Sequence, residues 1–136
     1  MQQAINVVER ALGWFNAVMS KSGHVITRED IERQFTPDAK MIANGQVKCT
    51  GIDGHLKHFR ELQAKLASFR IRLPLEQTVS SSERAAAYYL IDYKTVDGFA
   101  GVIHDSAIWE IRDQKLALMV ETVHFEGRIV ALENHD

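Results

Sequence analysis

The spacing of apolar residues changes near residue 68, and this change restricts the fold more than any other feature of the chain. Before it, apolar side chains recur every three or four residues, as in helices with one buried stripe. From Phe69 onward they alternate with polar side chains, as in strands with one buried face. Helices followed by strands predict an α+β fold, in which N-terminal helices pack on the concave face of a curved, mainly antiparallel β-sheet.

Three helices are expected in the first half of the chain. The first covers roughly residues 2–20 and has two adjoining apolar stripes, so it should be buried on more than one side. The second covers residues 27–34, because a threonine with an acid three residues later is typical of a capping box. The third is capped by Thr50 or Asp53 and ends near Ser68.

Strands are expected mainly in the second half. A strand starts at Phe69, and three longer ones follow, over residues 85–95, 101–111 and 115–125. In the first half, the turn pair Asn44-Gly45 predicts a short strand or hairpin within residues 38–48. The long strands are separated by short polar turns, so they should form an antiparallel meander.

Composition and charge narrow the class of protein. The 136 residues suit a single domain, 1–136, and the formal net charge of −2 gives no basic surface for nucleic acid. Apolar runs are too short to span a bilayer, and the N-terminus lacks the basic region of a signal peptide, so we expect a cytoplasmic protein without a membrane partner. The single cysteine, Cys49, allows neither an internal disulfide nor a zinc set, and we expect no cofactor.

Three short stretches match motifs of a known superfamily in the same order: Phe35-Thr36-Pro37-Asp38-Ala39, Thr50-Gly51-Ile52-Asp53-Gly54, and the closing hairpin Ile108–Leu116. Together with the order of elements, they resemble the superfamily of nuclear transport factor 2, ketosteroid isomerase and the SnoaL-like polyketide cyclases. The resemblance covers nearly the whole chain. It implies a cone-shaped fold, a conical pocket between helices and sheet, and often a dimer through the outer face of the sheet. Because this fold hosts many functions, it does not select one.

The alternation within each strand predicts which side chains face that pocket. In residues 101–111, Asp105 and Trp109 share one face, while His104 and Glu110 share the other. Family members place the hairpin aromatic, here Trp109, toward the pocket, so the resemblance implies that Asp105 points inward too. In the last strand Met119 shares a face with Glu121, near which limonene epoxide hydrolases carry a catalytic carboxylate.

The same alternation, extended to the preceding strand over residues 85–95, predicts the orientation of its side chains. Tyr88, Leu90 and Asp92 should face the pocket, while the residues between them should face outward. With residues from the first and third helices, the predicted ligand contacts are Trp14, Phe15, His55, Phe59, Tyr88, Leu90, Trp109 and Met119. His55 and His58 have no further ligands of the kind that a metal needs, so we expect no metal site.

Asp92, Asp105 and Glu121 are the candidate catalytic residues. A carboxyl group in an apolar pocket has a raised pKa, and a second acid nearby raises it further. Such a group acts near neutral pH as a general acid or base. The alternative is that these acids sit at wet strand ends or pair with arginines. Ketosteroid isomerase chemistry is not expected, because Ile42-Ala43-Asn44 has no acid where that family has its base.

The outer face of the predicted sheet is apolar enough to suggest an interface. A contiguous exposed patch of that kind usually marks a contact surface. We therefore expect a homodimer built sheet against sheet, with an isologous two-fold axis. The predicted interface residues are Tyr89, Ile91, Tyr93, His104, Ile108 and Val120.

These features favour a protein with a small-molecule pocket. The first hypothesis is a cofactor-independent acid–base enzyme of the isomerase, cyclase, dehydratase or hydrolase type, acting on an apolar or aromatic substrate. The alternative is a non-catalytic ligand-binding module or a dimeric assembly module of the same fold. An enzyme needs two polar groups that converge on one buried point, whereas an assembly module needs a filled cone.

Overall fold

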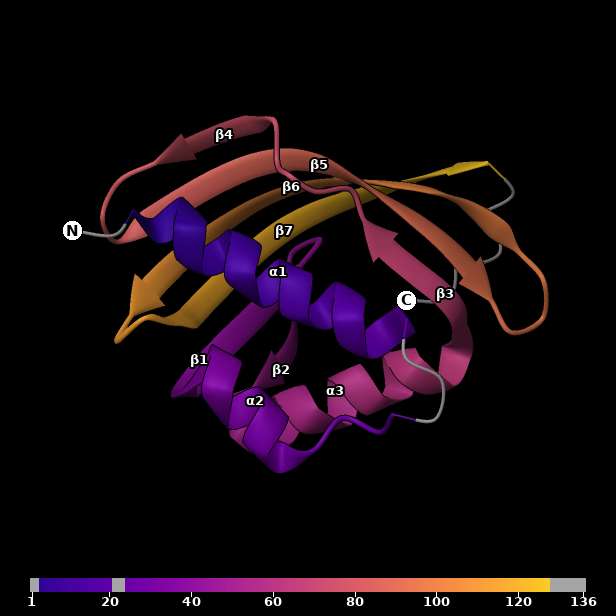
Figure 1. The fold of residues 1–136 in the computed structure, drawn as a ribbon, viewed down its shortest axis with the longest axis horizontal. Coiled ribbons are helices and arrows are strands. Elements are labelled where there is room, and N and C mark those ends of the chain that lie inside the picture. Colours follow the sequence, from indigo (N-terminus) through magenta and orange to yellow (C-terminus); the bar gives the residue numbers. More distant parts are fainter. Residues whose placement is uncertain (1–2, 21–23, 128–136) are drawn as a thin grey trace.

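The computed structural model describes residues 3–20 and 24–127, which form three helices and one seven-stranded sheet. The elements, in chain order, are α1 (Ala4–Ser20), α2 (Arg28–Gln34), β1 (Phe35–Ala43), β2 (Gln46–Thr50), α3 (Gly51–Lys65), β3 (Leu66–Ile71), β4 (Gln77–Ser80), β5 (Arg84–Thr95), β6 (Ala100–Arg112) and β7 (Lys115–Gly127). The sheet curls around α1, and α2 and α3 lie beneath α1 (Figure 1). This is the α+β arrangement that the change of period predicts.

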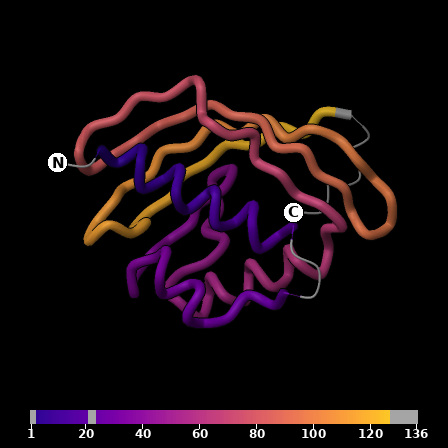
Figure 2. Tube along the Cα trace, in the orientation of Figure 1, coloured from indigo at the N-terminus to yellow at the C-terminus, as the bar shows by residue number. Residues whose placement is uncertain are grey.

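The strand order β2-β1-β7-β6-β5-β3, with β4 also paired to β5, makes the sheet mainly antiparallel. The exception is β1, which runs parallel to β7 and joins segments about 80 residues apart in the chain (Figure 2). This pairing brings Ala43 beside Glu121. The pairing extends the open sheet around the helices and places β7 beside a strand from the first half of the chain.

Local signals place most element boundaries. At the start of α2, the Thr27 hydroxyl accepts a hydrogen bond from the Asp30 amide at 3.2 Å, and the Asp30 carboxylate accepts one from the Thr27 amide at 2.9 Å. The capping box is therefore confirmed. Asn44 and Gly45 both have positive φ, of 48° and 81°, as the predicted hairpin turn requires.

The expected strand after Phe69 is divided in two. β3 begins earlier, at Leu66, and ends at Ile71, and β4 begins only at Gln77. Pro74 lies between them and has no N–H to donate to a sheet ladder, so one continuous strand cannot form. Because β3 begins at Leu66, the third helix ends at Lys65 rather than near Ser68.

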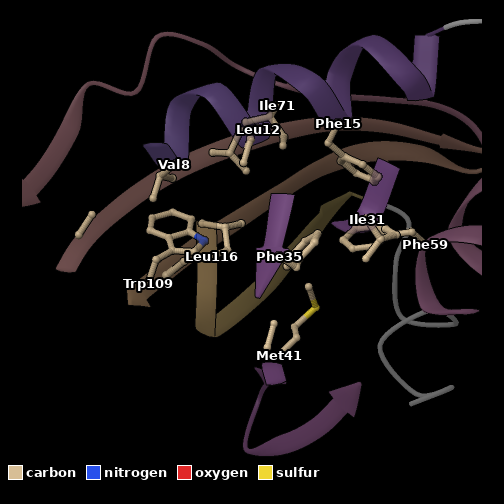
Figure 3. Packing of buried hydrophobic residues seen from close by; sticks show 14 of the residues in the cluster. Val8, Leu12, Phe15, Ile31, Phe35, Met41, Phe59, Ile71, Trp109 and Leu116 are labelled. Atoms are coloured by element: carbon tan, nitrogen blue, oxygen red, sulfur yellow. The ribbon is translucent and has the colours of Figure 1, made fainter. Parts of the chain in front are cut away.

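The core lies between α1 and the concave face of the sheet. Figure 3 shows Val8, Leu12 and Phe15 of α1 above Trp109 and Leu116 of the strands. Trp109 has no exposed surface and is the largest fully buried side chain among the described residues. Within residues 3–20 and 24–127, none of the helices has the length and apolar character needed to span a bilayer.

Asn16 ties α1 to the edge strand β3. Its amide nitrogen donates to the Ile71 carbonyl at 2.8 Å, and its side-chain oxygen accepts from the Ile71 amide at 2.8 Å. Asn16 thus satisfies both backbone groups of Ile71, whose side chain is buried. One side chain replaces the hydrogen bonds that a neighbouring strand would otherwise supply.

We expect Asn16→Ala to lower the free energy of unfolding by about 2 kcal/mol, because both backbone groups of Ile71 lose their partner. Urea unfolding of the purified protein measures this change. Asn6→Ala, at an exposed position of the same helix, is the control and should change stability by less than about 0.5 kcal/mol. Equal unfolding midpoints for the two variants would contradict the bracing role of Asn16.

Candidate functional site

The inner faces of β6 and β7 carry the side chains predicted for them. On β6, Asp105 and Trp109 are buried, with 2% and 0% of their surface exposed. The register pairs Ala107 of β6 with Glu121 of β7, and opposite residues of an antiparallel pair share a face. Asp105, Trp109 and Glu121 therefore all face the helices. Their catalytic or ligand-binding roles stay predictions.

The orientation predicted for β5 is wrong. Tyr89 and Ile91 are buried on the concave face, whereas Tyr88 is 45% exposed on the convex face. The register explains this, because Tyr89 lies directly opposite Asp105. Tyr88, Leu90 and Asp92 therefore do not line the concave side. Buried residues cannot form an outer interface. The prediction that Tyr89, Ile91 and Tyr93 belong to the dimer surface is therefore wrong.

Asp92 belongs to a surface ion pair rather than to the candidate site. Its carboxylate accepts from Arg72 Nε at 3.0 Å and Nη2 at 2.8 Å. The hydrogen bond from Arg72 lowers the pKa of Asp92, so this half-exposed group is ionised. A carboxylate held in this way by a guanidinium is a poor proton carrier near neutral pH.

The concave face brings two carboxyl groups and a phenol together. The Tyr89 hydroxyl donates to Asp105 Oδ2 at 3.0 Å, and both residues are buried. The Glu121 carboxyl lies near that of Asp105, and each of the two groups acts on the pKa of the other. Tyr89 is the site residue that sequence reasoning missed, because the period of β5 did not tell it from Tyr88.

Burial shifts both acids toward the protonated form. The pKa of Glu121 lies well above its usual range, first because of burial and then because of the hydrogen bond and charge of Asp105. Burial also raises the pKa of Asp105, but the hydrogen bonds from Glu121 and Tyr89 oppose this rise. Two adjacent carboxylates do not both ionise in an apolar site. The two carboxyl groups therefore titrate as one interacting pair, and both pKa values are raised.

A shared proton also explains an otherwise unsatisfied atom. Among the described residues, Asp105 Oδ1 is buried and receives no hydrogen bond from an amide, hydroxyl or amine. Buried polar atoms without partners are rare in folded proteins. A proton held between the two carboxyl groups would supply the missing donor. The pair would then carry a single negative charge, with the Tyr89 hydroxyl donating to Asp105 Oδ2.

The surroundings of the pair are apolar. Across the sheet, Glu121 is flanked by Ala43 on β1 and by Ala107 on β6. Lys48 of β2 is the cation whose charge acts on the pKa of Glu121, and its side chain is exposed. Burial and the Glu121 charge raise the pKa of the Cys49 thiol to about 12, so Cys49 is no thiolate nucleophile near neutral pH.

The predicted ligand contacts on the helices lie in an aromatic cluster of the core. Phe15 and Phe59 have ring centroids 4.9 Å apart, and Trp14 packs against Phe59 at 6.4 Å. His55 is buried against Phe35 at 4.4 Å, with its Nδ1 hydrogen-bonded to the Gly51 carbonyl at 2.7 Å. Burial lowers the pKa of His55, so its imidazole is neutral. Of the predicted contacts, only Trp109 and the half-buried Met119 lie on the strands and the face that carry the carboxyl pair.

Metal ligands do not converge at this place. In the described part of the chain, no group of three or more histidine, cysteine, aspartate or glutamate side chains is arranged to hold a metal ion. The candidate site therefore consists of Asp105, Glu121 and Tyr89 against apolar walls. Carboxyl and phenol groups are side chains that can transfer protons.

Comparison by sequence with models of protein families and with curated proteins gives no match. Comparison by structure gives several. An NTF2-like protein from Exiguobacterium sp. 255-15 has a TM-score of 0.69 at 15% identity, over 87% of this chain and 98% of that one. TerC, co-crystallised with polyporic acid, has a TM-score of 0.69 at 16% identity, over 96% and 95% of the two chains. A Jannaschia sp. CCS1 protein described as a SnoaL-like polyketide cyclase has a TM-score of 0.68 at 13% identity, over 96% and 88%.

The chain has the NTF2-like fold. The resemblance seen in the motifs is confirmed at this level, and so is the predicted arrangement of helices on a curled sheet. At these identities the likeness establishes the fold alone, since one fold hosts many chemistries. The site of this chain therefore has to be argued from its own carboxyl pair.

We expect Glu121→Gln to flatten the dependence of stability on pH. A raised pKa in the folded state gives stability that is fully present below the ordinary pKa of 4.5 and is lost as pH rises through the raised value. The natural protein should thus lose stability relative to the variant as pH rises above 4.5. Urea unfolding at several pH values measures the difference.

Asp92→Asn is the control for this experiment. Arg72 lowers the pKa of Asp92, so its contribution is present above the ordinary pKa of 3.8 and is lost only as pH falls through the lowered value. The control should therefore differ in stability from the natural protein only in acid. Above about pH 5 its stability should change with pH as that of the natural protein does. Parallel curves for Glu121→Gln and the natural protein would show that the pair does not share a proton.

Proposed function

We propose that the concave face binds a small apolar molecule and transfers protons to and from it through Asp105 and Glu121. The observation that carries the proposal is the pair of neighbouring carboxyl groups on the concave face, Asp105 and Glu121, with the Tyr89 hydroxyl bonded to Asp105 and with both carboxyl pKa values raised by burial. An ionised acid next to a protonated one supplies a general base and a general acid at a single point. The pair needs no cofactor for this chemistry.

The roles follow from the hydrogen bonds. Asp105, ionised and oriented by Tyr89, is the base that removes a proton from a carbon next to a carbonyl group. Glu121 donates its proton to the carbonyl oxygen, so the substrate passes through a neutral enol. One proton leaves the pair as another enters it. The pair keeps one negative charge throughout, and the substrate gains none in the apolar site.

The apolar walls indicate the class of ligand. Trp109 is stacked on Tyr89 with ring centroids 5.9 Å apart, and Met119 faces Trp109 across the ladder. Half-buried Val123 and Phe125 continue the same face of β7. Such walls suit an apolar or aromatic carbonyl compound. The co-crystal of TerC with polyporic acid and the description of the Jannaschia protein as a polyketide cyclase support a small-molecule ligand for this fold.

The alternative is a non-catalytic module of the same fold. One observation favours it: Trp109 and its neighbours fill the centre of the concave face, as an assembly module would require. A sheet-to-sheet homodimer stays a prediction, resting now on His104, Ile108 and Val120. A cytoplasmic location also stays a prediction.

Exchange of carbon-bound hydrogen tests the proposed function. With 2-tetralone, an aromatic cyclic ketone, in heavy water, the natural protein should accelerate replacement of the α-protons by deuterium, measured by proton NMR. Asp105→Asn and Glu121→Gln should each reduce this rate by roughly 100-fold, because each removes one of the two proton carriers. Asp92→Asn, which alters a convex-face carboxylate, should exchange at the natural rate.

The melting temperature measured with the same ketone separates the two candidate functions. A ligand-induced rise without any exchange would support the binding module and contradict the enzyme. Equal exchange rates for the natural protein and its three variants would show that Asp105 and Glu121 do not transfer the protons.

A further inference from the structure

A second hydrogen-bonded group lies on the convex face, on the opposite side of the sheet from the carboxyl pair. The Tyr88 hydroxyl is 2.5 Å from His104 Nδ1, and His104 Nε2 is 2.9 Å from Glu126 Oε2. The three residues come from adjacent strands, β5, β6 and β7. We call this group the Tyr88 relay.

The relay has a fixed direction. A carboxylate only accepts hydrogen bonds, so His104 donates its Nε2–H to Glu126. Neutral imidazole then has its lone pair on Nδ1, and Tyr88 donates its O–H to that atom. A nucleophile bonded to a base, and a base oriented by a third group, is the arrangement that activates hydroxyl nucleophiles in proteins.

Tyr88 differs from the other two tyrosines of the chain in accessibility. It is 45% exposed, whereas Tyr89 and Tyr93 are 5% and 4% exposed. Tyr88 is therefore the phenol that an external reagent reaches most easily, and its hydroxyl is bonded to an imidazole. The buried tyrosines serve as internal controls.

A shallow groove of about 510 Å³ starts at Tyr88 and runs over the convex face. Its apolar lining comes from Val79 of β4, Ile108 of β6 and Val120 of β7, and the first two are more than half exposed. Such side chains suit an aliphatic chain rather than a charged group. The groove would hold a flexible acyl chain with its carbonyl end beside the phenol.

We propose that Tyr88 is a nucleophilic tyrosine that accepts an acyl group from an activated ester or thioester with an aliphatic chain. The phenol oxygen attacks the carbonyl carbon, and its proton passes to His104 Nδ1. The bond from that carbon to the leaving oxygen or sulfur then breaks with its electron pair. His104 returns the proton to the leaving group, so the products are O-acyl-tyrosine and an alcohol or thiol. Glu126 positions the imidazole and balances its transient charge.

The charges nearby favour an acyl donor over a phosphoryl donor. Glu126 belongs to the relay itself, and the Asp92 carboxylate lies on the same face, paired with Arg72. An anionic phosphate would approach two carboxylates, while an ester or thioester carbonyl is neutral. The relay acts only where this face is open, so the proposal excludes a homodimer built over His104, Ile108 and Val120.

Acylation by p-nitrophenyl butyrate and p-nitrophenyl acetate tests the proposal. Released p-nitrophenolate measures the rate of the initial burst, and peptide mass spectrometry locates the acyl group. We expect one equivalent on Tyr88 and none on Tyr89 or Tyr93. Butyrate should half-saturate the burst at a roughly fivefold lower concentration than acetate, because its longer chain contacts the groove. Ile108→Ser should remove that difference.

Variants of the relay identify its parts. His104→Gln should slow the burst by roughly 10- to 100-fold, since the base is lost, while leaving half-saturation by the ester unchanged. Glu126→Gln should slow it by roughly tenfold with the same half-saturation, as expected for a positioning residue. Both side chains are partly exposed, so unchanged melting temperatures should accompany these losses. Tyr88→Phe should abolish the burst.

Three results would overturn the proposal. One is acylation of Tyr88 in His104→Gln at the same rate as in the natural protein. Another is modification spread over lysines with Tyr88 unmodified. The third is loss of Tyr88 acylation as the protein concentration rises, which would indicate that a second copy covers this face.

Discussion

The register of β6 against its two neighbours decides what every residue of the sheet does. Asp105 lies opposite Tyr89 on one side and Val123 on the other, and all three face the helices. A slip of one residue would expose the whole inner row of β6 and bury the outer one. Trp109, with no exposed surface, makes such a slip costly, because a large aromatic side chain would leave the core. The packing of the core thus holds the carboxyl pair in place.

Sequence alone could predict the parts of the fold that have local signals. The capping box at Thr27 and the Asn44-Gly45 turn lie within a few residues of their partners, so they can be read from the chain. Alternation, combined with the inward position that the family resemblance implies for Trp109, predicts the inner faces of β6 and β7. The sequence therefore predicts Asp105 and Glu121 as candidates, but it does not show that they are neighbours.

The orientation of β5 had no such signal. Tyrosines occupy two consecutive positions, 88 and 89, and aliphatic residues occupy the next two, so both faces are equally apolar. Only the pairing of Tyr89 with Asp105 tells them apart, and that contact spans 16 residues. The packing of the helix residues had no local signal either: His55 and Phe59 pack around Phe35, and this arrangement depends on distances between elements.

The parallel contact of β1 with β7 has a consequence for how the site comes into being. Glu121 is placed beside Ala43 by a pairing between segments about 80 residues apart, whereas the β5–β6 and β6–β7 hairpins form between neighbours in the chain. Distant pairings close large loops and tend to form late in folding. The Tyr89–Asp105 contact lies within one hairpin and can precede that closure. The apolar surroundings that raise the pKa of Glu121 would then appear only in the last stage of folding, so its affinity for the proton would report completion of the fold.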